Sequence, residues 1–315
     1  MYNIETTTES GLTRIIIKNS QTDEYLSIVP RYGGNINDMV LQKNGKLYPI
    51  IAGYKTVDEF EKHEYYRNSK LLPFTNRLKN GNYSFEGKNY QLPINEEDLN
   101  NTLHGFFYKR EFEIAEREVC EEYGKLILKT LYNSELEGYP FKFSAELSYE
   151  FSSENGLILT TKIVNKCEEL IPIGDGWHPY FTFGGKVDDL FLKVPKGVVN
   201  LLDSQNIPTG NQMPCERFIK SEKIEDYLLD TGLSLETDND ALTEIYNPEE
   251  NVTIILWQKT GHRLYNYLQV FIPPDRMSIA VEPMTCNANA LNNKDGLIIL
   301  SPGEKITTVC GIQLK

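Results

Sequence analysis

The segment Phe141-Lys142-Phe143-Ser144-Ala145-Glu146-Leu147-Ser148-Tyr149-Glu150-Phe151 alternates apolar and polar side chains along its whole length. Alternation with a period of two residues is typical of a half-buried β-strand. Turn residues follow at Ser153-Glu154-Asn155-Gly156, and a second strand-like run covers residues 157–164. Two such runs joined by a short turn predict a long antiparallel hairpin.

Strand-like runs continue on both sides of this hairpin. Residues 83–85 and 90–92 flank the turn Glu86-Gly87-Lys88, which predicts a second and tighter hairpin. The best helix signal is a capping box at Thr56-Val57-Asp58-Glu59, which predicts one or two helical turns that extend toward residues 61–66. Further runs rich in β-branched and aromatic residues cover 14–18, 125–131, 253–258, 268–272 and 306–314.

The domain organisation is predicted to be simple. No proline- or serine-rich linker and no repeat divides the 315 residues. We therefore expect residues 1–315 to form one all-β domain, a large antiparallel β-sandwich with a few short helices.

Composition limits the partners of this domain. The formal net charge is −13, and the acidic surface that this implies repels nucleic acid and anionic membranes. A neutral small molecule is a better ligand for such a surface. The N-terminus lacks a basic start followed by an apolar run, so we expect a cytoplasmic protein, as a monomer or a homodimer.

The cysteines are widely spaced and form no Cys-x-x-Cys pair, so they predict reduced, mostly structural thiols and no zinc or redox site. They are Cys120, Cys167, Cys215, Cys286 and Cys310.

The run Gly174-Asp175-Gly176-Trp177-His178-Pro179-Tyr180-Phe181 contains the most informative of the four histidines. An imidazole titrates near neutrality and can give or take a proton at working pH. The flanking glycines allow the backbone to hold it in a cleft. Alternatively, His178 is a buried core histidine whose nitrogens are satisfied by hydrogen bonds.

Three more segments contain candidate functional groups. Arg77 precedes the turn at Gly81, and His104 precedes a glycine and two aromatic residues. Glu282 lies in an apolar strand end directly before Pro283. Glutamate is rarely buried without a reason, and burial would raise its pKa toward the range of a useful base. Taken singly, each of these residues is also compatible with a structural role, such as an ion pair for Arg77.

Together these segments resemble the aldose 1-epimerase family, which includes the galactose mutarotases. The resemblance extends from about Gly33 to the C-terminal strand. The residues that carry it are Tyr32-Gly33-Gly34-Asn35-Ile36, Asn76-Arg77-Leu78, Gly81, Tyr83, Gly87, Tyr90-Gln91-Leu92, Leu103-His104-Gly105, Trp177-His178-Pro179-Tyr180-Phe181 and Val281-Glu282-Pro283.

The resemblance implies a β-supersandwich that binds a free sugar and interconverts its α and β anomers without a cofactor or a metal. Glu282 would be the base at the C1 hydroxyl, and protonated His178 would be the acid at the ring oxygen. Sugar oxygens would be bound by Arg77, His104 and Asn76. The family also uses an aspartate on the sugar hydroxyls, which we assign to Asp230, with Asp226 as the alternative.

Three alternatives remain open at the level of sequence. The segments that follow His178 and Glu282 depart from the better-known mutarotases, so the substrate is not assured, and a hexose 6-phosphate is the second candidate. Two histidines and a carboxylate are also a common set of metal ligands. A non-catalytic carbohydrate-binding protein of the same fold is the third alternative, because a fold does not guarantee chemistry.

Overall fold

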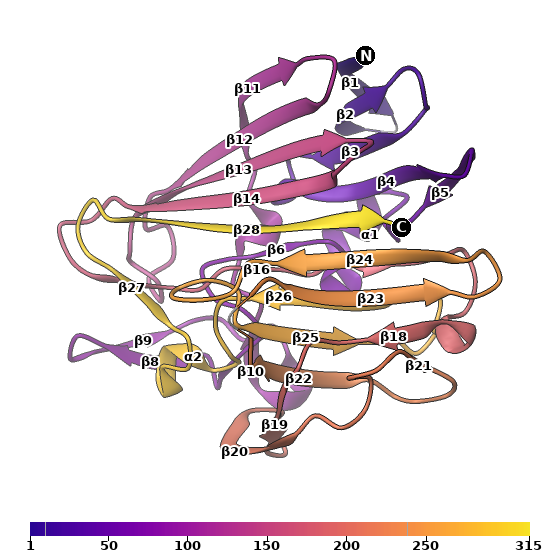
Figure 1. Cartoon of the computed structure of the whole chain (residues 1–315). Helices are drawn as coiled ribbons and strands as arrows, with labels where there is room; N and C mark the ends of the chain where they lie inside the picture. The colour runs from indigo at the N-terminus through magenta and orange to yellow at the C-terminus, as the bar shows by residue number, and fades with distance from the viewer. Residues whose placement is uncertain (10, 238) are drawn as a thin grey trace.

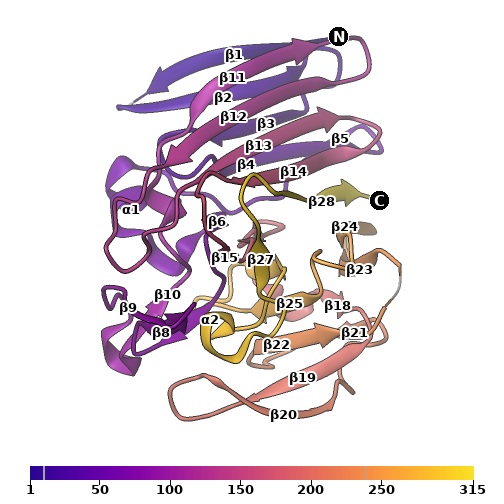
Figure 2. The same cartoon turned by 90° about the vertical axis from the view of Figure 1, so that its left-hand side faces the viewer.

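The computed structural model describes residues 1–9, 11–237 and 239–315, and almost all of its regular structure is antiparallel β-sheet (Figure 1). Figure 1 looks onto a nine-stranded sheet, behind which lie a five-stranded sheet from the N-terminal part of the chain and an eight-stranded sheet. The view turned by 90° separates these layers (Figure 2). The predicted all-β sandwich is confirmed.

The nine-stranded sheet contains the long hairpin that the alternating pattern predicts. β13 (Phe143–Ser152) pairs with β14 (Gly156–Asn165) along its whole length. Every second residue of β13 is buried, so its apolar face lies on the core. The sheet order is β11-β12-β13-β14-β28-β24-β23-β18-β21, with β11 (Glu113–Val119), β12 (Gly124–Tyr132), β28 (Lys305–Leu314), β24 (Val252–Gln258), β23 (Ala241–Asn247), β18 (Phe191–Lys193) and β21 (Glu222–Lys223).

The eight-stranded sheet collects strands from distant parts of the sequence. Its order is β20-β19-β22-β25-β26-β16-β6, and β17 pairs with β26 outside this path. The strands are β20 (Pro208–Pro214), β19 (Gly197–Leu202), β22 (Asp230–Leu235), β25 (Tyr267–Phe271), β26 (Ile279–Met284), β16 (Gly176–Trp177), β6 (Lys70–Leu71) and β17 (Tyr180–Phe181).

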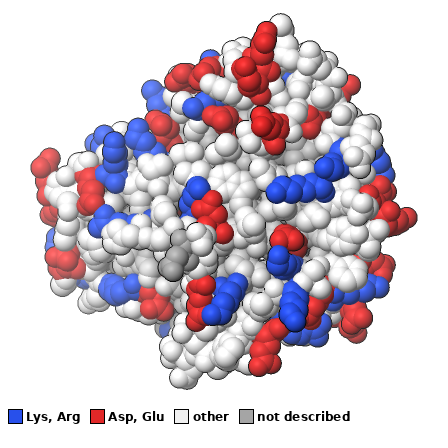
Figure 3. Space-filling model, in the orientation of Figure 1, with Lys and Arg blue, Asp and Glu red and all other residues white. Residues whose placement is uncertain are grey.

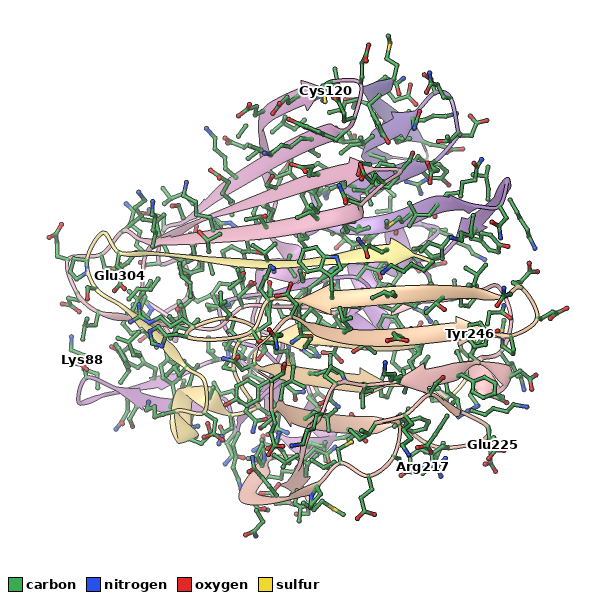
Figure 4. The ribbon with its side chains drawn as sticks, viewed as in Figure 1. Lys88, Cys120, Arg217, Glu225, Tyr246 and Glu304 are labelled. Atoms are coloured by element: carbon green, nitrogen blue, oxygen red, sulfur yellow. The ribbon has the colours of Figure 1, made fainter. Side chains whose placement is uncertain are left out.

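The remaining strands form the five-stranded sheet and three two-stranded pairs. The tight hairpin predicted around Gly87 is confirmed as β8 (Asn82–Phe85) and β9 (Lys88–Gln91), with Lys88 at the edge of the molecule (Figure 4). The others are β1 (Tyr2–Glu9), β2 (Leu12–Asn19), β3 (Tyr25–Val29), β4 (Asn35–Lys43) and β5 (Lys46–Pro49) in sequence order, and the pairs β7 (Arg77–Lys79) with β10 (Asn101–Leu103) and β15 (Ile171–Ile173) with β27 (Ile298–Leu300).

Helices are short. Thr56 caps α1 (Val57–Lys62) by accepting the Glu59 N–H, whereas the Glu59 carboxylate accepts the N–H of Lys55 instead of closing the box on Thr56. A left-handed residue at His63, with φ 48°, ends α1 earlier than the predicted segment to residue 66. The others are α2 (Ala290–Asn293) and the 3-10 helices Glu64–Tyr66, Glu97–Leu99, Phe107–Lys109 and Val187–Asp189. In the part of the chain that the structure describes, no helix has the length and apolar character of a membrane span.

The core joins the layers. One hydrophobic cluster contains Leu26 of the five-stranded sheet, Leu147 of the nine-stranded sheet and Leu268 of the eight-stranded sheet.

All five cysteines are free, and Cys120 lies at the top of the molecule in Figure 4. Acidic and basic side chains are interspersed over the face in Figure 3. The single domain over residues 1–315 stays a prediction.

A buried ion pair connects the eight-stranded sheet to the nine-stranded sheet. Lys70 Nζ lies 2.6 Å from Asp175 Oδ1, and both side chains are almost fully buried. The other Asp175 oxygen accepts hydrogen bonds of 2.6 Å from Tyr265 and Thr308, while Lys70 donates to Thr161 at 2.9 Å. Thr161 and Thr308 belong to the nine-stranded sheet, whereas Lys70 belongs to the eight-stranded one. No motif in the sequence assigns a role to Asp175.

We predict that Asp175→Asn lowers the free energy of unfolding by about 3 to 5 kcal/mol, because it leaves the Lys70 ammonium buried without a counter-charge. Urea denaturation monitored by fluorescence measures the change. The control is Lys193→Met, which breaks the half-exposed pair with Glu244 and should cost less than about 1 kcal/mol. Equal effects of the two substitutions would contradict the prediction.

Candidate active site

One face of the eight-stranded sheet presents three polar side chains from adjacent strands. Gln269 of β25 is directly opposite Glu282 of β26, and Asp230 of β22 is opposite Phe271. Residues opposite each other or two apart in a strand point to the same side of a sheet, so Asp230, Gln269 and Glu282 lie on one face. Gln269 Nε2 donates to Asp230 Oδ1 at 2.6 Å.

His178 lies between β16 and β17, where Pro179 interrupts the strand. Its backbone N–H donates to the Ser69 carbonyl at 3.0 Å, and its carbonyl accepts from Asn68 N–H at 3.0 Å. Its ring stacks on Tyr180, with the centroids 5.0 Å apart and the planes 7° apart. These contacts hold His178 Nε2 at 3.3 Å from Glu282 Oε1.

His104 reaches the same site from the β7–β10 pair. Its backbone N–H donates to the carbonyl of Asn76 at 2.9 Å, and its ring lies edge-on to that of His178, with centroids 5.0 Å apart. Gly105, at φ +64°, is required here, because a Cβ atom would lie 2.1 Å from the Leu72 carbonyl oxygen. Asn76 also lines the cavity, and its Oδ1 accepts the Arg77 backbone N–H at 2.8 Å.

These elements enclose a cavity of about 310 Å³ that contains all six of the site residues predicted from sequence. Trp177 does not line it, since its indole is buried behind the site and donates to the Asn68 carbonyl. Asp226 is exposed outside the cavity, so the geometry favours Asp230 over Asp226. The cavity is lined by Tyr65, Tyr66, Asn76, Arg77, Glu96, Leu103, His104, His178, Tyr180, Asp230, Gln269, Phe271 and Glu282.

Burial sets the protonation of the site. It lowers the pKa of His178 to about 3 and the pKa of His104 well below its usual value. Burial, with a smaller contribution from the charge of Asp230, raises the pKa of Glu282 well above its usual value. Burial therefore favours neutral imidazoles at His178 and His104 and the protonated form of the Glu282 carboxyl group. At 3.3 Å, Glu282 Oε1 and His178 Nε2 are close enough for a proton to pass between them.

Several buried polar atoms of the site are not satisfied within the protein. Among the described residues, His104 Nδ1, His178 Nδ1 and Glu282 Oε2 have no hydrogen-bond partner. An unpaired buried polar atom is costly, which is typical of functional sites. One ligand atom from each of these three residues lies within 4.8 Å of the others. The set suits either proton transfer or the binding of a divalent transition metal.

The sequence does not reveal several residues of the cavity. Gln269 lies in a run that is predicted as a strand, but only the register of β25 against β26 places it beside Glu282. Glu96 lies in a polar loop with two further acidic residues, and no local signal distinguishes it. Tyr65 and Phe271 come from separate segments and lie with ring centroids 6.1 Å apart.

Comparison with known proteins identifies the family. The family model described as aldose 1-epimerase matches residues 16–313. The chain belongs to the aldose 1-epimerase family. The uncharacterized protein YihR of Escherichia coli K12 is 28% identical over 238 residues, which cover 74% of each chain. Galactose mutarotase of Rattus norvegicus is 24% identical over 181 residues, or 56% of this chain and 51% of the relative.

Solved structures of this family have the same fold. A galactose mutarotase-like protein from Clostridium acetobutylicum superposes with a TM-score of 0.88 at 23% identity and covers 100% of this chain and 98% of its own. Galactose 1-epimerase from Lactobacillus acidophilus NCFM gives a TM-score of 0.81 at 17% identity, with coverage of 100% and 98%. At sequence identities this low, the structural similarity establishes the fold alone.

We predict that Glu282→Gln stabilises the protein increasingly as the pH rises. The pKa of Glu282 is raised above 4.5 in the folded state, so folded-state stability is lost as the pH rises above that value. Glutamine has no such loss, and the difference should grow by up to about 1.4 kcal/mol per pH unit.

Urea denaturation between pH 4 and pH 8 measures this difference. A stability difference that stays constant over this range would contradict the raised pKa of Glu282.

Proposed function

We propose that this protein is an aldose 1-epimerase that interconverts the α and β anomers of a neutral free hexose by opening and closing the sugar ring. The observation that carries the proposal is the 3.3 Å approach of His178 Nε2 to Glu282 Oε1. Both groups are buried at a cavity lined with donors and acceptors for hydroxyl groups. Ring opening requires one base and one acid at neighbouring oxygens, and this pair supplies both.

Ring opening moves two protons, one from the C1 hydroxyl to Glu282 and one from His178 to the ring oxygen. The Glu282 carboxylate takes the proton of the C1 hydroxyl while the C1 to ring-oxygen bond breaks. The electron pair of that bond goes to the ring oxygen, which takes a proton from the His178 imidazolium. Rotation about the C1–C2 bond turns the new aldehyde, and the reverse proton transfers close the ring on its other face.

The protonation of the free site corresponds to the open-chain stage of this reaction. After ring opening, Glu282 is protonated and His178 is neutral, which are the forms that burial favours in the free protein. In this scheme the cyclic sugar reacts after a proton moves from Glu282 to His178. Hydrogen bonds from sugar hydroxyls and the positive charge of Arg77 favour the carboxylate and promote this transfer.

The other residues of the cavity bind the hydroxyl groups. Asp230 is exposed to the cavity and is oriented by the N–H of Gln269, so its remaining lone pairs accept sugar hydroxyls. The amides of Asn76 and Gln269 and the imidazole of His104 offer neutral donors and acceptors.

The charges around the cavity favour a neutral sugar over a phosphosugar. Of the described residues that line it, only Arg77 is a lysine or arginine, and it is already paired with Glu96. The cations that lie near the motifs in sequence do not line the cavity, and Lys70 is in the buried ion pair. These cations are Arg31, Arg67, Lys70, Lys79 and Arg110.

A non-catalytic sugar-binding protein is less well supported. Binding requires donors and acceptors for hydroxyl groups, but it does not require a buried carboxyl group in contact with a buried imidazole. Polarimetry of fresh α-glucose, α-galactose and other aldoses separates the two functions. If the purified protein binds an aldose but does not accelerate its mutarotation, the proposed epimerase activity is contradicted.

We predict that Glu282→Gln and His178→Asn each lower turnover by about 100- to 10,000-fold, because each removes one proton carrier. Sugar affinity should change far less, since the other hydroxyl-binding groups remain. Polarimetry gives the rate and isothermal titration calorimetry gives the affinity. Glu244→Gln, on the nine-stranded sheet, is the control and should retain full activity. Substantial turnover in Glu282→Gln would contradict its assignment as the base.

We also predict that dialysis against EDTA leaves the rate unchanged, because Glu282 and His178 supply both proton transfers. The test separates this mechanism from metal binding by His104, His178 and Glu282. Loss of activity that added Zn²⁺ restores would support the metal instead.

A further inference from the structure

Arg77 is held by a bidentate ion pair at the wall of the cavity. Its Nε lies 3.0 Å from both carboxylate oxygens of Glu96, and its Nη2 lies 2.8 Å from Oε1. Both side chains are largely buried, with 14% and 16% exposure. Among the described residues, none hydrogen-bonds to Nη1, so this end of the guanidinium remains available to a ligand. Two of the three guanidinium nitrogens are therefore occupied before any sugar arrives.

Glu96 is itself fixed in place. It exchanges two backbone hydrogen bonds of 3.1 Å with Asn101, and the Asn101 side chain donates to Glu96 Oε2 at 2.9 Å. Asn101 is fully buried and begins β10, which pairs with the strand of Arg77 through Leu103. The carboxylate of Glu96 is thus part of a rigid wall, and it cannot swing away from Arg77 without breaking these bonds.

The ion pair determines the charge that a ligand meets. Arg77 is the one cation among the described residues that line the cavity, and its charge is balanced by Glu96. The remaining carboxyl groups belong to Asp230 and Glu282. A carboxylate or phosphate on the substrate would meet the Asp230 carboxylate, while the one lining cation is already paired with Glu96, and juxtaposed like charges oppose binding.

We propose that Glu96 is a specificity-determining residue that prevents Arg77 from binding anionic groups and so restricts the site to uncharged aldoses. The proposal rests on the proposed function and names the substrate class of the same site. A free guanidinium presents a planar fork of donors that matches a carboxylate or a phosphate. Glu96 occupies that fork and leaves only the Nη1 end for a sugar hydroxyl. The site would therefore discriminate against anionic sugars by charge repulsion, in addition to binding neutral sugars through their hydroxyl groups.

The test is a charge-neutral replacement with a matched control. Glu96→Gln removes the counter-charge, whereas Glu97→Gln removes the same charge from the exposed neighbour, which does not line the cavity. The probes are two pairs that differ only at C6, glucose with glucuronate and galactose with galacturonate. Calorimetry at low ionic strength gives the ratio of the dissociation constants, uronate over neutral sugar, for each protein.

We expect Glu96→Gln to lower this ratio at least about tenfold, through tighter binding of the uronate. Glu97→Gln should leave the ratio as in the unmodified protein. Adding Arg77→Met to Glu96→Gln should abolish the gain, because the gain depends on the freed guanidinium. Glu96→Ala provides a second route to the same result should Glu96→Gln not fold.

An unchanged ratio in the Glu96 variants would overturn the proposal, as would an equal change in Glu97→Gln or a gain that survives loss of Arg77. Tight binding of uronates by the unmodified protein would also overturn it. These outcomes are separate from the proposed function, which is decided by the mutarotation rate of the unmodified protein. Binding ratios remain measurable even if that rate equals the rate in buffer.

Discussion

The ion pair between Lys70 and Asp175 holds together the two backbone segments that position His178. Lys70 follows Ser69, whose carbonyl accepts the His178 N–H, and Asp175 precedes β16, the strand that leads into His178. The pair therefore fixes both backbone segments that flank this residue. Its hydrogen bonds to Thr161 and Thr308 extend the constraint to the opposite sheet. Removing one partner of a buried ion pair is strongly destabilising, so the position of the site is coupled to the packing of the two sheets.

The buried pair of Glu282 and His178 is a local cost that the rest of the fold offsets. Burial disfavours the charged form of both side chains, and one polar atom of each, Glu282 Oε2 and His178 Nδ1, has no partner among the described residues. The protein carries this local cost because the surrounding β-sheets form a continuous core. A local conflict within an otherwise consistent fold is characteristic of a functional site.

The sequence predicts the local features of this structure better than the ones that depend on register. Alternation over residues 141–164 predicts the β13–β14 hairpin because both strands and their turn are contiguous. His178 and Glu282 stand out because each lies in a short unusual context. Gln269 and Glu96 do not, since their roles depend on strand pairing between segments that no local pattern aligns. The four-residue helix α2 is too short to leave a periodic signal.

The backbone at Gly105 divides the site into two parts with different evolutionary freedom. A side chain there would collide with the Leu72 carbonyl, so the turn that holds His104 tolerates almost no substitution. Asp230 and Phe271, in contrast, project from regular strands whose backbone does not depend on the identity of their side chains. Side chains on these strands can therefore be exchanged without disturbing the backbone, whereas the position of His104 depends on keeping a glycine at residue 105.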